Sequence, residues 1–319
     1  MLRSYGVALV LTVGEMVLVT GAAWAQNFPV KPIRVLTSSV GGGGDFAARL
    51  IGESLRSSVG WSVVVDNRPT IVERVIVRNA APDGYTVLLL SSSLWVIPLL
   101  QKTPYDAVQD FSPITITDRI PCIVVAHPSL AASSIKELIA MARAKPGELN
   151  YSSGATGSSS HLPAELFKSM AGVNIVRIPY NGAGPAVNAV ISNQVQVMFA
   201  TSGSVAAHVK SGRLKALAVT TAQPTPLAAG LPTVAASGLP GYEATAINVM
   251  FAPARTPAAV INRLNQEIVR VLNQQDVKEK FFSIGSDAVG STPQELAATM
   301  RSDIASMGKV IKDAGIRAD

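Results

Sequence analysis

The chain has 319 residues, of which 48% are apolar and 15% charged, a balance that excludes an intrinsically disordered protein. Its length allows about two domains of roughly 150 residues each. Lys and Arg number 27 against 21 Asp and Glu, so the net charge is +6. The sequence contains no run of Lys and Arg residues and therefore disfavours nucleic-acid binding.

The first 25 residues have the pattern of a secretory signal. Arg3 precedes an apolar run that begins at Val7, and Ala23-Trp24-Ala25 forms a small-residue cleavage site. A membrane anchor is the alternative, but Glu15 interrupts the run, which falls short of the ~20 residues that span a bilayer. We therefore expect export, with cleavage after Ala25.

Short β-branched runs then alternate with helix-length amphipathic segments, a pattern typical of α/β units with largely parallel sheets. In the first half we expect strands over 33–37, 62–65, 85–90, 114–117 and 120–126, with helices over 45–57 and 72–79. The last of these strands contains Cys122, the only cysteine, which we expect to be a buried, inert thiol.

The second half repeats the alternation. Strands are expected over 149–152, 174–178, 195–200 and 214–219, with helices before Gly172, over 184–193 and over 205–210. Capping boxes predict helix starts at Ser134 and Thr292, and Thr256 followed by Pro257 predicts another. Residues 224–241, rich in Pro and Gly, are expected to form a loop.

Motifs for cofactor, metal or catalytic chemistry are missing from the sequence. Phe46 stands where the last glycine of a G-x-G-x-x-G motif would fall, and the three histidines lack metal-ligand spacing. We expect no cofactor, no metal and no catalytic site. The alternative is an exported serine hydrolase, with a nucleophile among Ser158–Ser160 and His161 or His208 as the base, within ~3 Å of the serine.

Two glycine- or serine-rich loops, 38–45 and 154–160, each follow an expected strand and precede an expected helix. Backbone N–H groups at a helix start, together with the helix dipole, bind carboxylate or phosphate without an arginine. Neither loop contains Arg or Lys. Each could also be an ordinary turn in which Asp45 or a serine caps the helix. Two such loops in separate halves of the chain favour two sides of one anion-binding cleft.

Further motifs occur in a characteristic order. They are Lys31-Pro32-Ile33-Arg34, Asn67-Arg68-Pro69, Pro82-Asp83-Gly84-Tyr85-Thr86, Asp110-Phe111-Ser112-Pro113-Ile114, His127-Pro128-Ser129-Leu130, Pro179-Tyr180-Asn181-Gly182 and Gly238-Leu239-Pro240-Gly241-Tyr242. With both loops, this order resembles the substrate-binding receptors of tripartite tricarboxylate transporters, the Bug-type periplasmic receptors. The resemblance covers nearly the whole chain after residue 25.

The resemblance implies an α/β, two-domain, periplasmic-binding-protein-like fold of type II-like topology, with crossing strands around a ligand cleft. Domain one would comprise 26–126 plus 248–319, and domain two 127–247. It also implies a non-enzymatic periplasmic receptor, expected to be a monomer, that captures a small carboxylate and docks on membrane permease subunits. A receptor that presents ligand to a sensor, or a degenerate copy that binds nothing, remains an alternative.

The ligand-binding residues are carried over from the matching motifs. The first loop supplies Ser38, Ser39, Gly43 and Asp45, and Ser92 and Thr201 stand at strand ends that face the cleft in the family. An acid with a free amine would use Asp45 as its counter-charge. The opposite side of the cleft would comprise Gly157, Ser158, Ser159 and Ser160, with Asn181 and Gly182 nearby.

Three segments depart from the family pattern. Thr70-Ile71-Val72-Glu73-Arg74 follows Asn67-Arg68-Pro69, where the family usually carries a Gly-Ala-Gly-Gly-Asn-like run. The segment from there to Pro82 is about three residues shorter than in the family. Ser38-Ser39-Val40 replaces a Pro-Phe-Pro-Pro-like stretch, and Ile247 stands where an aromatic residue is usual. We expect these changes to alter the shape of the cleft, so that either the ligand differs from that of typical members or binding is weak.

Overall fold

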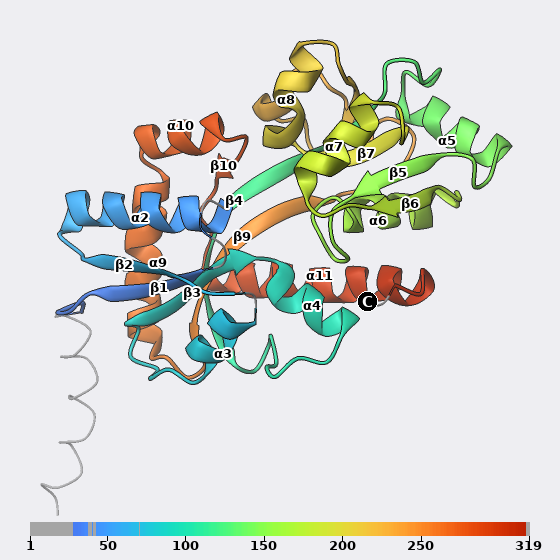
Figure 1. Ribbon diagram of the computed structural model, residues 1–319. Helices are drawn as coiled ribbons and strands as arrows, with labels where there is room; N and C mark the ends of the chain where they lie inside the picture. The colour runs from blue at the N-terminus through green and yellow to red at the C-terminus, as the bar shows by residue number, and fades with distance from the viewer. Residues whose placement is uncertain (1–27, 38–39, 41–42, 70, 317–319) are drawn as a thin grey trace, which may run out of the picture.

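Two long antiparallel strands, β4 (Phe111–Ala126) and β9 (Thr245–Pro253), connect the two lobes of the protein (Figure 1). The computed structural model describes residues 28–37, 40, 43–69 and 71–316. Residues 111–121 of β4 pair with β9, and its last five residues pair with strands of the other lobe. The polypeptide therefore passes from one lobe to the other along β4 and returns along β9.

The first lobe has a sheet in the order β2-β1-β3-β9-β4. The parallel strands β1 (Ile33–Thr37), β2 (Val63–Asn67) and β3 (Thr86–Ser91) lie on one side of β9, and the short β10 (Asp287–Ala288) pairs with β4. One face packs against α2 (Gly43–Val59), α9 (Ala258–Leu272) and α10 (Gln275–Ser283). The other packs against α3 (Val72–Arg78), α4 (Ser93–Leu100) and α11 (Pro293–Asp313).

The second lobe continues the sheet as β4-β7-β5-β6, with β8 (Lys215–Val219) also paired to β4. Its parallel strands are β5 (Asn150–Ser153), β6 (Val176–Pro179) and β7 (Val197–Thr201). Helices α5 (Ile135–Ala144) and α6 (Leu162–Ala171) cover one face, and α7 (Ala183–Ile191) and α8 (Ser202–Lys210) cover the other. A 3-10 turn, Pro226–Ala228, lies in the expected loop.

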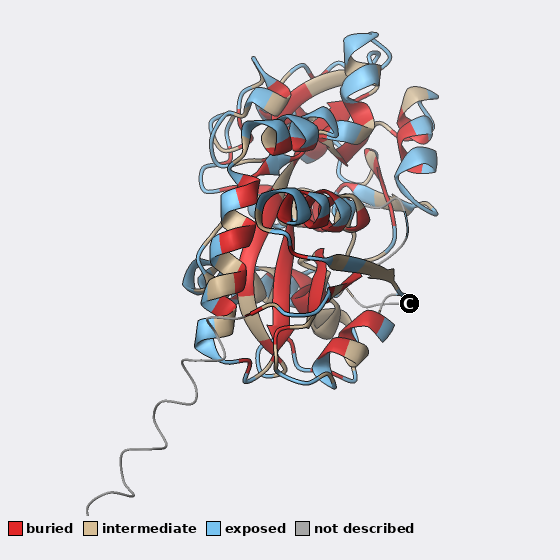
Figure 2. Ribbon diagram, turned by 90° about the vertical axis from the view of Figure 1, so that its left-hand side faces the viewer, coloured by how far each residue is buried: buried red, intermediate tan, exposed pale blue. Residues whose placement is uncertain are grey.

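Both sheets are buried between helix layers, as the central strands in Figure 2 show. This burial explains the near-continuous apolar runs of the strands, because a parallel sheet covered on both faces has no polar side. The expected α/β fold with crossing strands is confirmed. Among the helices that the structure describes, none is long and apolar enough to cross a bilayer.

Several predicted elements are wrong in detail. Strands 114–117 and 120–126 are one strand, β4, because Asp118 between them is buried and hydrogen-bonded rather than exposed in a turn. Helix α2 begins at Gly43, so Asp45 lies inside its first turn instead of before it. Helices α4 and α10 and strand β9 were not predicted; α4 contains Pro98 and has no apolar–polar period to mark it.

Two of the three predicted helix caps are confirmed. At α11 the Thr292 hydroxyl accepts from the Glu295 N–H, and the Glu295 carboxylate accepts from the Thr292 N–H, which is the complete capping box. The Ser134 hydroxyl accepts from the Glu137 N–H at the start of α5. The Thr256 hydroxyl instead donates to the Pro253 carbonyl, so it does not cap α9.

Candidate functional site

The two predicted loops meet the same crossing strand. A Cβ on Gly43, at the start of α2, would lie 3.6 Å from Nδ2 of Asn248 and 4.0 Å from Cδ1 of Ile120. In the other lobe, the carbonyl of Ser159 accepts a hydrogen bond from Sγ of Cys122 at 3.4 Å. Residues two apart on a strand share a face, so Ile120 and Cys122 turn the same face of β4 toward both loops. The start of α2 and the second loop therefore border one stretch of β4.

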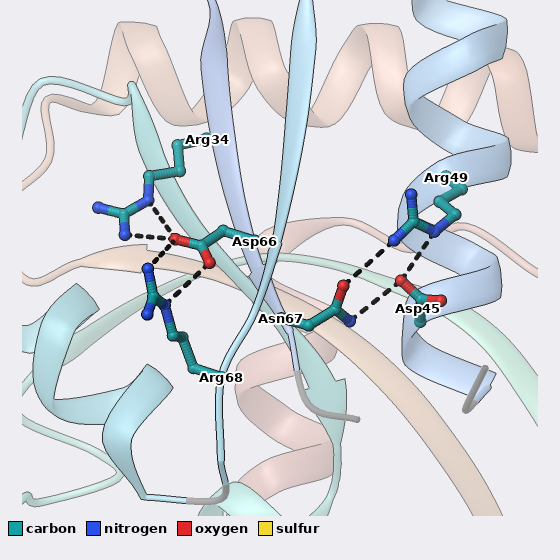
Figure 3. A network of polar contacts seen from close by, with 6 residues as sticks. All are labelled: Arg34, Asp45, Arg49, Asp66, Asn67 and Arg68. Atoms are coloured by element: carbon teal, nitrogen blue, oxygen red, sulfur yellow. Dashed lines mark hydrogen bonds and ion pairs between the residues drawn. The ribbon is translucent and has the colours of Figure 1, made fainter. Parts of the chain in front are cut away.

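Asp45 is bound to the chain around it (Figure 3). Its Oδ1 lies 2.9 Å from Nε of Arg49 and accepts from Nδ2 of Asn67 at 3.0 Å, while Arg49 donates to the Asn67 side-chain oxygen. The residue is only 4% exposed. The Asn67-Arg68-Pro69 motif thus holds the first turn of α2 against the end of β2, and Asp45 takes part in this contact. A direct contact between Asp45 and a ligand stays a prediction.

A second set of charges flanks this contact in Figure 3. Asp66, on β2, accepts from Nε of Arg34 at 2.8 Å and lies 2.9 Å from Nε of Arg68. Burial opposes ionisation of Asp66, but the hydrogen bonds from Arg34 and Arg68 outweigh it and hold its pKa below the usual value. The pairing joins β1 to β2 and to the segment that leads into α3.

Arg177, on β6, holds the start of the second loop by hydrogen bonds. Its three nitrogens donate to the Ser153 hydroxyl at 2.8 Å, the Gly154 carbonyl at 2.9 Å and the Thr156 hydroxyl at 3.0 Å. The sequence analysis missed this residue because it lies outside the loop in sequence, on a neighbouring strand. Its signal is an arginine inside the short apolar strand 174–178.

The serines of the second loop have different environments. The Ser160 hydroxyl is buried, accepts from the Gly154 N–H at 2.9 Å and lies 3.2 Å from the Ser158 hydroxyl. Ser159 is the exposed member of the group, and Gly157 and Ser158 are partly exposed. Ser160 therefore shapes the loop, while Ser159 presents its side chain outward.

His161 stabilises the same loop as a neutral acceptor. Its Nδ1 accepts from the Gly157 N–H at 3.0 Å, and the ring is 2% exposed. Burial, aided by the positive charge of Arg177, lowers the pKa of His161 to about 4. Within the described ranges no hydrogen bond joins a hydroxyl of residues 158–160 to a histidine ring, so the pair that the hydrolase alternative requires is not formed.

The other predicted residues lie at the carboxyl ends of strands, where ligands bind in α/β folds. Thr201 ends β7 and pairs in register with Cys122, so it lies beside the Ser159 contact. Ser92 follows β3, and its N–H donates to the Ile247 carbonyl. Asn181 and Gly182 follow β6, which the order β4-β7-β5-β6 places at the sheet edge, away from the crossing strands. Ser38 and Ser39 lie outside the described residues.

A buried polar cluster on the crossing strands also escaped the sequence analysis. The Asp118 carboxylate accepts from Nδ2 of Asn248 at 3.0 Å, from the Ser286 hydroxyl at 2.6 Å and from the Thr117 hydroxyl at 2.8 Å. Burial raises the pKa of Asp118, and these hydrogen bonds oppose the rise. Asn248 is thereby fixed beside Gly43, at the end of α2 that faces β4.

The lobes also touch away from β4 and β9. A Cβ on Gly157 would lie 2.8 Å from Cδ1 of Leu100, at the end of α4. On another side, the Ser202 hydroxyl of α8 donates to the Gly285 carbonyl at 2.6 Å. The second loop is therefore in van der Waals range of the first lobe.

Three further observations concern other kinds of site. A cavity of about 530 Å³ opens between α4, α11 and residues 103–110, lined in part by Trp95 and Tyr105, and includes no residue of either loop. No group of three or more His, Cys, Asp or Glu in the described part of the chain could hold a metal ion. Cys122 is buried as expected, and burial raises the pKa of its thiol to about 12.

Two α/β lobes joined by crossing strands, with the starts of helices near those strands, are the fold of periplasmic binding proteins. The chain belongs to the family described as "Tripartite tricarboxylate transporter family receptor", which matches residues 47–316. The family resemblance of the sequence motifs is thereby confirmed.

Individual relatives cover almost all of the chain. "Protein BugT" of Bordetella pertussis is 31% identical over 97% of this chain and 98% of its own length. Among solved structures, "R. palustris Rpa4515 with adipate" has a TM-score of 0.77 and 32% identity, covering 92% of this chain and 100% of that one. "MatC (Rpa3494) from Rhodopseudomonas palustris with bound malate" has a TM-score of 0.71 and 25% identity, covering 89% and 100%.

Proposed function

We propose that the protein is a periplasmic receptor that captures a small carboxylate between its two lobes, without catalysing a reaction. It would deliver this ligand to the membrane subunits of a tripartite tricarboxylate-type transporter. Family membership supports the receptor role, and the adipate and malate held by two similar structures support a carboxylate.

One observation carries the proposal: the start of α2 and the loop before α6 border the same face of β4. A carboxylate there would meet backbone N–H groups and the positive end of the α2 dipole. Exclusion of water by the two lobes would strengthen these contacts. The residues proposed to contribute are Ser38, Ser39, Gly43, Asp45, Ser92, Gly157, Ser158, Ser159, Ser160, Asn181, Gly182 and Thr201.

We propose domain limits at 26–126 plus 248–319 for the first domain and 127–247 for the second. The core clusters support the outline of this division, since two consist mainly of first-lobe residues and two of second-lobe residues. The exceptions lie near the limits or between the lobes: residues 123–126 of β4 pack in the second-lobe clusters, and Leu162 and Ile247 pack in a first-lobe cluster. Closure would then bend β4 and β9 where Pro121 pairs with Thr245.

Export is the remaining part of the proposal. Its basis is the order of Arg3, the apolar run and Ala23-Trp24-Ala25. Expression of the full chain in a Gram-negative host, followed by intact-mass measurement of the periplasmic product, should give a chain that begins at Gln26. A product that keeps residues 1–25 would contradict it.

Thermal-shift screening of the purified protein against adipate, malate, aspartate and benzoate tests the binding function. A ligand that binds only the folded protein raises the melting temperature. A hit recovered chemically unchanged supports the receptor, and a hit consumed by the protein supports the hydrolase. The absence of any shift at millimolar ligand would indicate a copy that has lost binding.

A further inference from the structure

The segment that departs from the family pattern contains a buried ion pair. Glu73 and Arg74, both on α3, are each 1% exposed, and Nη1 of Arg74 lies 3.0 Å from Oε1 of Glu73. Oε2 of Glu73 and Nε of Arg74 are buried without a hydrogen-bond partner among the described residues. Burial raises the pKa of Glu73 to about 7, although Arg74 opposes the rise. The pair is therefore poorly compensated.

Incomplete pairing is a weak basis for stability. Removing two charges from water is costly, and a buried ion pair offsets that cost only when the remaining donors and acceptors are also satisfied. Apolar side chains of similar volume would fill the same space between α3 and β3 without this cost. The position of the Arg74 guanidinium is better explained by the group to which its Nη2 atom is hydrogen-bonded.

That group is Ser93, the first residue of α4. Nη2 of Arg74 donates to the Ser93 hydroxyl at 2.7 Å, and the Ser91 hydroxyl donates to the same oxygen at 3.0 Å. With two donors on its oxygen, Ser93 must direct its own hydrogen to another acceptor, and no hydrogen bond in the described part of the chain receives it. Residues 91–93 are all partly exposed, so an external acceptor can reach this corner.

The corner adjoins the first loop. Ser91 pairs in register with Asn248 across β3 and β9. Directly paired residues of antiparallel strands lie about 5 Å apart. The Asn248 amide in turn lies within 3.6 Å of the Cβ position of Gly43. Ser93 therefore lies two residues after Ser91, the last residue of β3, and Ser91 neighbours the start of α2 through Asn248.

We propose that Ser93 donates a hydrogen bond to the second carboxylate of a dicarboxylate ligand, and that Arg74 is the residue that positions and polarises it. This inference depends on the proposed carboxylate-binding function, which it narrows to dianions. The first carboxylate would lie between the start of α2 and the second loop. The start of α4, with its dipole, adds to the positive potential at the second.

Adipate and hexanoate provide the matched probes, because they differ only in the second carboxylate. Calorimetry on the full mature protein should show tighter binding of adipate by the native chain. Ser93→Ala should weaken adipate binding by about 10-fold, the effect typical of a lost hydrogen bond to a charged group, and leave hexanoate unchanged. Ser169→Ala, an exposed serine on α6, should change neither affinity.

The role of Arg74 needs a second readout, because its replacement can also destabilise the fold. Arg74→Met should reduce the adipate preference to that of Ser93→Ala, and Arg74→Lys should restore part of it. The melting temperature of each variant separates misfolding from lost selectivity. When Arg74→Met fails to fold, Ser93→Ala and Arg74→Lys still decide the question.

Other outcomes would overturn the inference. Equal losses of adipate and hexanoate affinity in Ser93→Ala would place Ser93 at the shared carboxylate, and unchanged affinities would remove it from the site. A native protein that binds monocarboxylates as tightly as dicarboxylates would refute the second subsite but leave the proposed receptor intact. A native protein that binds no carboxylate would refute both.

Discussion

Replacing Gly157 with alanine tests whether the second loop must lie against α4. Gly157 has φ +80°, and an added Cβ would lie 2.8 Å from Cδ1 of Leu100 and 3.7 Å from Cγ1 of Val96. A non-glycine residue in the left-handed region costs about 1–2 kcal/mol. The contact at 2.8 Å is too short for a real Cβ, so Leu100 or the loop must also move.

Gly172→Ala is the matched control. Gly172 also has positive φ, at +61°, but its Cβ would have no atom within 4 Å, so the substitution introduces the backbone cost alone. Both variants should lower the free energy of unfolding in urea by about 1–2 kcal/mol. Only Gly157→Ala should also weaken ligand binding, by about 10-fold or 1.4 kcal/mol, because the loop is displaced from α4.

The double variant Gly157→Ala/Leu100→Ala identifies the cause. Truncation of Leu100 removes the atom that the new methyl group meets, so affinity should return toward that of Leu100→Ala alone. Calorimetry with the best ligand of the carboxylate screen measures the four affinities. Equal affinities for Gly157→Ala and Gly172→Ala, or no recovery in the double variant, would show that the approach of the lobes at this point does not contribute to binding.

Three further substitutions test the loops themselves. Asp45→Asn should lower the melting temperature, since it weakens the contact with Arg49, but should leave the affinity for an acid without an amine nearly unchanged by calorimetry. Arg177→Met removes three charge-assisted hydrogen bonds and should cost about 3 kcal/mol of unfolding free energy in urea, with weaker ligand binding. His161 has a pKa of about 4 when folded and 6.5 as its ordinary value, so the unfolded chain binds more protons between these limits. His161 should therefore make the free energy of unfolding rise by roughly 3 kcal/mol between about pH 4 and 6.5. His161→Asn should remove this contribution in urea titrations, and an unchanged slope of unfolding free energy against pH would refute the assigned pKa. Glu73, with its pKa raised to about 7, contributes the opposite slope, so the comparison with the native chain is essential.

The parts of the fold that were predictable have strong local signals. Capping at Thr292 and the strand at 33–37 depend on neighbouring residues alone, and both occur. Helix α4 was missed because its eight residues are almost uniformly apolar around Pro98, so no helical period distinguishes them from a loop. Strand β4 was divided because a buried carboxylate such as Asp118 depends on partners more than 100 residues away, Asn248 and Ser286.

The site shows the same limit. Sequence alone predicted the connections from β1 to α2 and from β5 to α6, because glycine and serine clusters between a strand and a helix are local features. It could not place Arg177 or Asn248, which reach the loops from other strands. Nor could it distinguish the exposed Ser159 from the buried Ser160, since their exposure depends on the hydrogen bond between the loop and Gly154.

The loops themselves contain no Arg or Lys, yet an arginine supports the second loop and another supports Ser93. Arg177 donates to the Gly154 carbonyl and the Thr156 hydroxyl of the second loop, and Arg74 donates to the hydroxyl of Ser93. In both cases the guanidinium lies one hydrogen bond behind the groups that would meet a ligand. A hydroxyl that accepts from a guanidinium is a stronger donor to the next acceptor, because the chain of hydrogen bonds is polarised. Such an arrangement would attract an anion without a direct salt bridge that would slow its release, as the proposed delivery of the ligand requires.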